Sequence, residues 1–186
     1  MTDNIISRST SIDEIINKFN GECLIINCQY SGFLKLGTGL DSAGDVIAVV
    51  YEPNELEECI DDKTCIWKIT EDDDGYYFKN ERDPGNEFYL FRGADRDQGD
   101  YTIYGESKWH DDRKKRSQFG LHHKPIEHGA PPVPLSYYII ASDDSYYGSA
   151  YYLKSGVAKD KWGCHQVYAT PNMTNDQRDL WFLIPA

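Results

Sequence analysis

The sequence predicts an all-β domain made of three repeated four-strand units, twelve strands in all, with a short helix before them. Three observations lead to this fold class. Helical spacing of apolar residues stops at Gly21, and short runs of Tyr, Phe, Ile, Val and Leu separated by Gly, Asp, Asn and Pro follow it, as in proteins with many short strands. One strand motif occurs three times. The number of repeats fits a closed barrel better than a propeller.

The N-terminal extension, residues 1–21, contains the predicted helix, which spans residues 11–20. Ser11 is the expected N-cap, Glu14 is its capping-box partner, and Gly21 ends the helix. One face of this helix is apolar: Ile12, Ile15, Ile16 and Phe19. Because so short a helix buries little surface and is marginal alone, we expect it to close one end of the domain rather than to bind a partner or a membrane.

The motif that defines the repeat is an aromatic residue, a leucine and a glycine at constant spacing. It occurs as Phe33-Leu34-Lys35-Leu36-Gly37, Tyr89-Leu90-Phe91-Arg92-Gly93 and Tyr152-Leu153-Lys154-Ser155-Gly156. Each unit opens with an earlier strand, at Cys23–Asn27, Tyr76–Asn80 or Tyr137–Ala141. We therefore expect one domain over residues 22–186, with units at about 22–74, 75–135 and 136–186.

A turn and two further strands follow the motif in each unit. An aspartate and then a glycine favour a tight turn between two strands, and they stand at Asp41 and Gly44, Asp97 and Gly99, and Asp160 and Gly163. The next strand has an inward position at Ala48, Ile103 or Val167. The last strand places an aromatic and an aliphatic residue on one face: Trp67 and Ile69, Phe119 and Leu121, Trp181 and Leu183.

Three units are too few for a propeller, which needs about four or more blades to close around its axis. A closed three-fold barrel remains, in which the repeated leucines, small aliphatic residues and closing aromatics form stacked inner layers. Closure also removes the free sheet edges that invite aggregation.

With this triplication, residues 22–186 resemble the β-trefoil superfamily, whose four-strand units are related by pseudo-three-fold symmetry. Within it, the run from Tyr30 to Gly37, the pair Gly44-Asp45 and the ending from Leu180 to Pro185 are most similar to the trefoil domain of insect haemolymph low-molecular-weight lipoproteins. This narrower resemblance implies a storage or interaction role.

Ricin-B-like lectins are a more distant branch of the same superfamily. Their repeats carry an aspartate after the repeated leucine and end in Gln-x-Trp. This chain has Lys35, Phe91 and Lys154 after the leucines. Its closing motifs read Cys65-Ile-Trp67 and Asp179-Leu-Trp181, without the glutamine. A ricin-type sugar site is therefore not expected at these positions.

Composition excludes some partners. The formal net charge of −12 opposes binding to phosphate backbones, so we expect no nucleic acid. No apolar stretch approaches the roughly 20 residues that cross a bilayer, so we expect no transmembrane segment.

Met1–Arg8 shows no secretory signal, which predicts a cytoplasmic chain if the sequence is complete and a secreted one if a signal was removed. The odd number of cysteines, five, leaves open whether Cys59 and Cys65 are bridged.

The candidate ligand-binding residues lie in unit three: Asp160, Trp162, Tyr146, Tyr147 and Tyr151. A carboxylate can accept hydrogen bonds from a sugar's hydroxyl groups while a neighbouring ring covers its apolar face. The aspartate has a second interpretation, because Asp in a tight turn caps backbone amides, and this accounts for its repetition. The aromatic residues are unrepeated, which makes them the better candidates.

Other clusters predict no chemistry. The basic run Arg113–Arg116 is expected in a solvated loop, with a processing site, a localisation signal or an anion-binding patch as alternatives. His122, His123 and His128 match no metal motif, and the acidic run Glu71–Asp74 lacks the calcium-loop pattern, so we expect no metal and no cofactor. No nucleophile elbow or phosphate-binding glycine loop is present, and we expect no enzyme activity.

The sequence leaves three functions open. The first is a non-catalytic, lectin-like protein that binds a carbohydrate or glycoprotein through unit three. The second is a haemolymph-type storage or protein-interaction module that forms homo-oligomers. The third is a protease inhibitor that presents an exposed loop, such as Asn54–Lys63 or His110–Ser117, to an enzyme.

Overall fold

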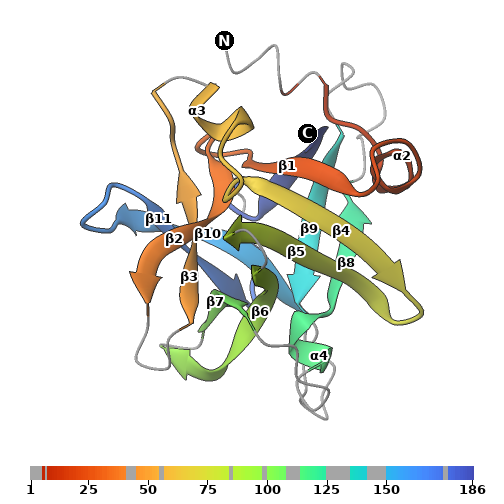
Figure 1. Cartoon of the computed structure of the whole chain (residues 1–186). Coiled ribbons are helices and arrows are strands. Elements are labelled where there is room, and N and C mark those ends of the chain that lie inside the picture. Colours follow the sequence, from red (N-terminus) through yellow and green to blue (C-terminus); the bar gives the residue numbers. More distant parts are fainter. Residues whose placement is uncertain are drawn as a thin grey trace.

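Twelve strands form one continuous sheet in the computed structural model of the chain (Figure 1). The structure describes residues 6, 8–40, 45–54, 57–83, 86–97, 100–107, 114–124, 135–141, 150–173 and 176–186. The strands are β1 (Glu22–Asn27), β2 (Phe33–Leu40), β3 (Val46–Tyr51), β4 (Ile66–Asp72), β5 (Gly75–Asp83), β6 (Asn86–Asp97), β7 (Asp100–Glu106), β8 (Phe119–His123), β9 (Ser136–Ala141), β10 (Tyr151–Lys159), β11 (His165–Thr170) and β12 (Leu180–Pro185). The predicted all-β fold class is confirmed.

The strands divide into a closed barrel and three hairpins. The barrel consists of β1, β4, β5, β8, β9 and β12, each antiparallel to the next, with β12 paired back to β1. The hairpins are β2–β3, β6–β7 and β10–β11. Their second strands, β3, β7 and β11, pair with one another in a triangle. The predicted three-fold closure is thus formed by two separate sets of strands.

The repeated apolar residues fill the core. All three motif leucines are fully buried, and so are the inward residues of the third strands: Leu34, Leu90, Leu153, Ala48, Ile103 and Val167. The closing aromatics are at most 1% exposed: Trp67, Phe119 and Trp181. Because the three units face one axis, equivalent positions meet there, which explains why these residue types repeat.

Helix α2 (Ile12–Lys18) packs against one end of the barrel, away from the hairpins (Figure 1). Ser11 is its N-cap, as predicted, with the hydroxyl oxygen accepting from the Glu14 N–H at 3.1 Å. Ile12 and Ile15 are buried in the core, and the Ile12 N–H donates to the Tyr137 hydroxyl at 3.0 Å. The helix therefore closes the barrel end, as expected.

Two details of the helix prediction are wrong. The Glu14 carboxylate accepts from Thr10 Oγ1 at 2.6 Å and from Lys18 Nζ at 2.9 Å, so the reciprocal capping-box bond to the Ser11 N–H is not formed. The helix ends at Lys18 instead of residue 20, and Phe19, placed on the apolar face, is 37% exposed. A left-handed backbone at Asn20 and Gly21, with φ of 54° and 80°, redirects the chain into β1.

Two predicted loops contain short helices. Helix α4 (Lys114–Ser117) includes most of the basic run, for which a loop was expected. Helix α3 (Glu57–Ile60) lies within the segment 54–63, which was considered as an inhibitory loop. Cys59 in α3 is fully buried in a second apolar cluster with Phe33 and Cys65, so this part of the segment packs on the domain.

Candidate functional site

The turn between β10 and β11 is built around the side chain of Asp160. Its Oδ1 accepts hydrogen bonds from the backbone N–H groups of Trp162 at 2.8 Å and Cys164 at 2.9 Å. The Gly163 N–H donates to the Asp160 carbonyl at 3.0 Å, and Gly163 has a left-handed φ of 79°. Asp160 thus caps the turn through one oxygen, and within the described residues its Oδ2 has no hydrogen-bond partner.

Trp162 is presented to solvent at the tip of this hairpin. Its side chain is 53% exposed, which is unusual for the residue type with the largest apolar surface. The Lys161 ammonium lies 4.2 Å from the ring centroid, in cation–π geometry. Within the described part of the chain, Lys161 is the only partner of the ring, so the ring face that Lys161 leaves open is available for stacking.

The turn end of the hairpin is fixed to unit one by a stacked pair of rings. Tyr30 and His165 stack with centroids 3.9 Å apart and an interplanar angle of 13°. His165 is 3% exposed, and its Nε2 lies 2.9 Å from Glu52 Oε1. The same oxygen of Glu52 forms a 2.8 Å ion pair with Lys159 at the end of β10. The turn that carries Trp162 is therefore held on both strands.

These contacts favour the charged form of Glu52. Burial raises the pKa of its carboxyl group, but hydrogen bonds from Lys159 and His165 outweigh burial, and the pKa lies below its ordinary value. The pKa of Lys159 is raised in turn, first by its hydrogen bond to Glu52. Each group stabilises the charged form of the other.

The structure brings together only part of the predicted site. Asp160 and Trp162 lie side by side in the turn. Tyr151 does not lie beside them: it is 2% exposed in the core, with its ring edge-on to Tyr101 at 4.9 Å. It directly precedes the motif aromatic Tyr152, and alternation along β10 turns it inward. Tyr146 and Tyr147 lie outside the described residues.

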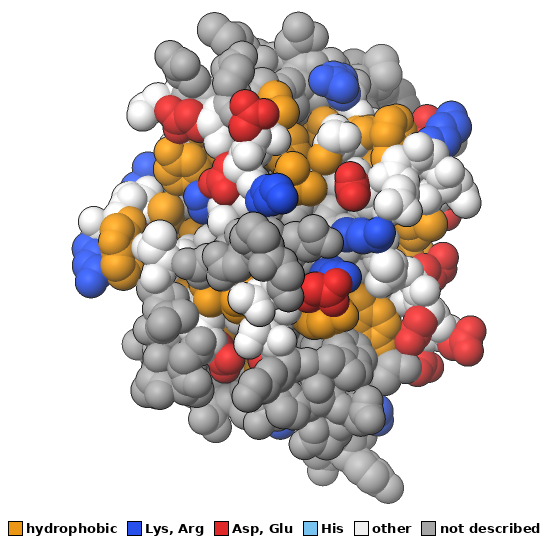
Figure 2. Space-filling view, viewed as in Figure 1, with side chains coloured by type: hydrophobic (Ala, Val, Ile, Leu, Met, Phe, Trp, Pro, Cys, Tyr) orange, Lys and Arg blue, Asp and Glu red, His pale blue; other side chains and the backbone are white. Residues whose placement is uncertain are grey.

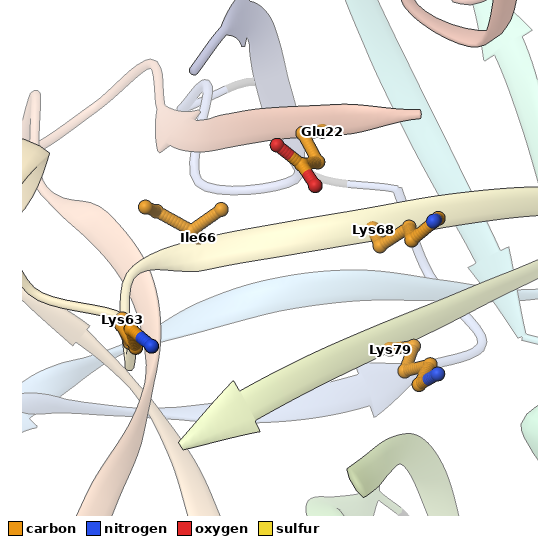
Figure 3. Close-up of a pocket in the computed structure, with 5 residues that line it drawn as sticks. All are labelled: Glu22, Lys63, Ile66, Lys68 and Lys79. Atoms are coloured by element: carbon orange, nitrogen blue, oxygen red, sulfur yellow. The ribbon is translucent and has the colours of Figure 1, made fainter. Parts of the chain in front are cut away.

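A pocket that sequence reasoning missed lies on the outside of the barrel. Its volume is about 180 Å³, and it is lined by Glu22, Lys63, Ile66, Lys68 and Lys79 from β1, β4, β5 and the residues before β4 (Figure 3). Lys and Arg side chains lie near the centre of this face, with Asp and Glu side chains among them (Figure 2). The only signal in the sequence was that Lys68 and Lys79 alternate with buried residues, which places them outside without showing that they are neighbours.

The described residues include no group of three or more His, Cys, Asp or Glu side chains that could hold a metal ion. The five cysteines are free thiols, and Cys23, Cys59 and Cys65 are buried. A hydrogen bond to Cys59 and then burial raise the pKa of the Cys65 thiol.

Within the described part of the chain, no helix has the length and apolarity to cross a membrane.

No protein-family model and no curated protein matches the sequence. Solved structures do match its fold. A salivary protein of the cysteine and tryptophan-rich family from the mosquito Culex is 15% identical, with 89% of this chain and 94% of that chain covered and a TM-score of 0.58. The designed three-fold symmetric protein ThreeFoil is 15% identical, with 89% and 99% covered and a TM-score of 0.55.

A third match is SeviL, in a structure bound to asialo-GM1 saccharide, at 15% identity, with 89% and 98% of the two chains covered and a TM-score of 0.52. At these identities the similarity concerns the fold. Together with the barrel and the triangle of hairpins, it makes the chain a β-trefoil. The narrower resemblance to insect haemolymph lipoproteins stays a prediction.

Proposed function

We propose that this protein is a non-catalytic, lectin-like binding protein whose ligand is a carbohydrate, bound at the β10–β11 turn. The observation that carries the proposal is Trp162, an indole 53% exposed on a turn that is held in place on both sides. A rigid exposed aromatic ring offers apolar contact at little cost in conformational entropy, which is why such residues dominate many binding sites.

The neighbouring carboxylate supplies the polar contact that a sugar needs. Asp160 uses Oδ1 for the turn, so its position is fixed before any ligand arrives. Its Oδ2 is then available to accept a hydrogen bond from a hydroxyl group of a sugar whose ring is stacked on Trp162. The two interpretations of Asp160, turn cap and ligand contact, are thus compatible, one for each oxygen.

The fold is compatible with sugar binding, because SeviL has the same architecture and is bound to a saccharide. The residues of a ricin-type site are absent here, since Lys35, Phe91 and Lys154 follow the repeated leucines. The proposed site therefore lies in the single turn of unit three and is not repeated three times.

A glycan array with the purified chain tests the proposal, with Trp162→Ala, Tyr147→Ala and Asp160→Asn as variants. Asparagine keeps an oxygen for the two turn amides and removes the carboxylate charge. Phe19→Ala is the matched control, because Phe19 is an exposed aromatic residue at the C-cap of α2, outside the turn. Loss of a hit in Trp162→Ala and its weakening in Asp160→Asn, with Phe19→Ala unchanged, support the site.

A clean negative array contradicts the proposal and favours the storage or interaction alternative. Size-exclusion chromatography across a salt series, with analysis of bound lipid, then tests that alternative. The inhibitor alternative predicts tight complexes with a protease, which inhibition assays measure directly. A glycan hit that survives Trp162→Ala and Asp160→Asn keeps the lectin class but moves the site elsewhere.

A further inference from the structure

The lysine-lined pocket places like charges directly opposite each other. Lys68 on β4 is the register partner of Lys79 on β5, and Glu22 on β1 is the register partner of Lys68 on its other side. The alternating residues Trp67, Ile69 and Phe78 are buried in the core, so this row faces outward. Like charges opposite each other in a sheet destabilise it, and the arrangement therefore needs a counter-charge.

The side chains of the described residues supply only part of that counter-charge. Lys79, whose side chain is 20% exposed, forms an ion pair with Glu87. Glu87 also lies close enough to Lys68 for the lysine charge to help lower the pKa of Glu87, but within the described ranges no hydrogen bond or ion pair joins Lys63 or Lys68 to an acidic side chain. Glu22 does not reach Lys68, although the two strands pair there. The pocket thus has a local excess of positive charge in a chain whose formal net charge is −12.

The size of the pocket limits what it can bind. At about 180 Å³ it is smaller than the 300–1,000 Å³ that is typical of sites for drug-sized ligands, so it fits one charged group or a single small ring. Lysine ammonium groups bind oxyanions as point charges with several donors each. Ile66, in the same lining, offers apolar contact beside them.

We propose that this pocket is a second binding site, for a small molecule or sugar that carries a sulfate or phosphate ester. Lys68 and Lys79, which point the same way from neighbouring strands, bind the oxyanion, while Ile66 and Lys63, at the other end of the pocket, contact the carbon frame (Figure 3). The Glu22 carboxylate, on the opposite side, accepts a hydrogen bond from a hydroxyl group and repels a ligand with charge at both ends. This site lies between units one and two and does not depend on the carbohydrate site of unit three.

Titrations of the ¹⁵N-labelled full chain with glucose 6-phosphate, glucose 6-sulfate, glucose, inorganic phosphate and inorganic sulfate test the proposal. Amide shifts at residues 63–68 and 79 report binding in the pocket, and the inorganic ions separate the oxyanion from the carrier. The expected result is saturable binding of at least one ester, weaker binding of the inorganic ions and none of glucose. Added sodium chloride weakens the binding because salt screens the lysines.

Variants locate the site. Lys68→Gln removes one charge-assisted contact and is expected to weaken ester binding about tenfold or more. Lys124→Gln is the matched control, because Lys124 is exposed after β8 and outside the pocket, and it is expected to leave binding unchanged. Lys68→Gln also relieves the repulsion from Lys79, so its thermal stability is expected to equal or exceed that of the parent, which separates loss of binding from unfolding.

Three results overturn the proposal: no saturable shift with either ester, equal weakening by Lys68→Gln and Lys124→Gln, or equal shifts with glucose and its esters. The second result means diffuse attraction of anions, and the third means a neutral sugar site. Trp162→Ala distinguishes the two proposals, since it is expected to abolish glycan binding at the β10–β11 turn and to leave the ester titration unchanged.

Discussion

The indole Nε1 of Trp181 donates a hydrogen bond of 3.0 Å to the backbone carbonyl oxygen of Leu153. The same contact joins Trp67 Nε1 to the Leu34 carbonyl at 2.8 Å in unit one. Both leucines belong to the repeated motif, and both tryptophans close their units. The contact ties the last strand of a unit to its second strand. Unit two has Phe119 at this position and no donor.

Trp181→Phe is expected to lower the free energy of unfolding by about 2 to 4 kcal/mol, from the lost hydrogen bond and the smaller buried volume. Phenylalanine fits the fold at this position, since Phe119 occupies its equivalent in unit two, 1% exposed. Urea denaturation measures the change. Trp67→Phe is expected to cost a similar amount. A cost under 0.5 kcal/mol in either variant contradicts this account.

A second buried contact breaks the three-fold symmetry. Asn27 Oδ1 accepts from Ser155 Oγ at 3.2 Å, and its Nδ2 donates to the Arg178 carbonyl at 2.9 Å. Asn80 is the equivalent residue in unit two, and its Nδ2 donates to the Ile66 carbonyl at 2.8 Å. Its Oδ1, however, is buried without a hydrogen-bond partner in the described structure, because Leu36 stands where unit three has Ser155.

Ser155→Ala is expected to destabilise the fold by about 1 kcal/mol. The cost stays moderate because Asn27 Oδ1 also accepts from the Gln29 N–H at 3.2 Å. The comparison of urea midpoints for parent and variant gives the value. Lys154→Ala, the neighbouring outward residue, serves as control, and an equal loss in both variants would falsify a specific role for the buried hydroxyl group.

Two glycines with the same backbone angle predict different costs for alanine. Gly21 has φ of 80° and Gly163 has φ of 79°. A Cβ at Gly21 would lie 2.3 Å from the Ile69 carbonyl oxygen, whereas at Gly163 nothing lies within 4 Å. Gly163→Ala is expected to cost about 1 kcal/mol for the left-handed conformation alone. Gly21→Ala is expected to cost about 3 kcal/mol or more, since the backbone must also move. Thermal melts of both variants test the order, and equal costs contradict it.

Stability is expected to fall in acid through Glu52. Its pKa is lower in the folded chain than the ordinary value of 4.5, so the carboxylate's contribution is fully present above pH 4.5 and is lost as pH falls through the folded value. Asp62, whose carboxylate forms a 2.8 Å ion pair with Lys35, also has a pKa below its ordinary value of 3.8. Its contribution to stability is likewise lost as the pH falls below 3.8. Urea denaturation between pH 3 and 7 gives the profile. Glu52→Gln is expected to flatten it, and an unchanged slope in that variant contradicts the assignment.

The fold could be predicted because its causes are local and repeated. A strand alternates inside and outside with a period of two, and turns need Asp and Gly, so the triplicated motif and the Asp160-to-Gly163 turn are visible in the sequence. The same rule places Tyr151 inward, because it stands two residues before the buried Leu153, so its choice as a site residue did not follow from the strand pattern.

By itself, then, the sequence determined the strands, their three-fold grouping, the core layers and the turn that carries Trp162. Only the tertiary structure decided which outward residues meet. Lys68 faces Lys79 and Glu22 because β4 pairs with β5 on one side and β1 on the other, and Tyr30 stacks on His165 across units one and three. Alternation assigns a residue to a face, whereas neighbours on that face depend on strand order and register, which are fixed only when the barrel closes.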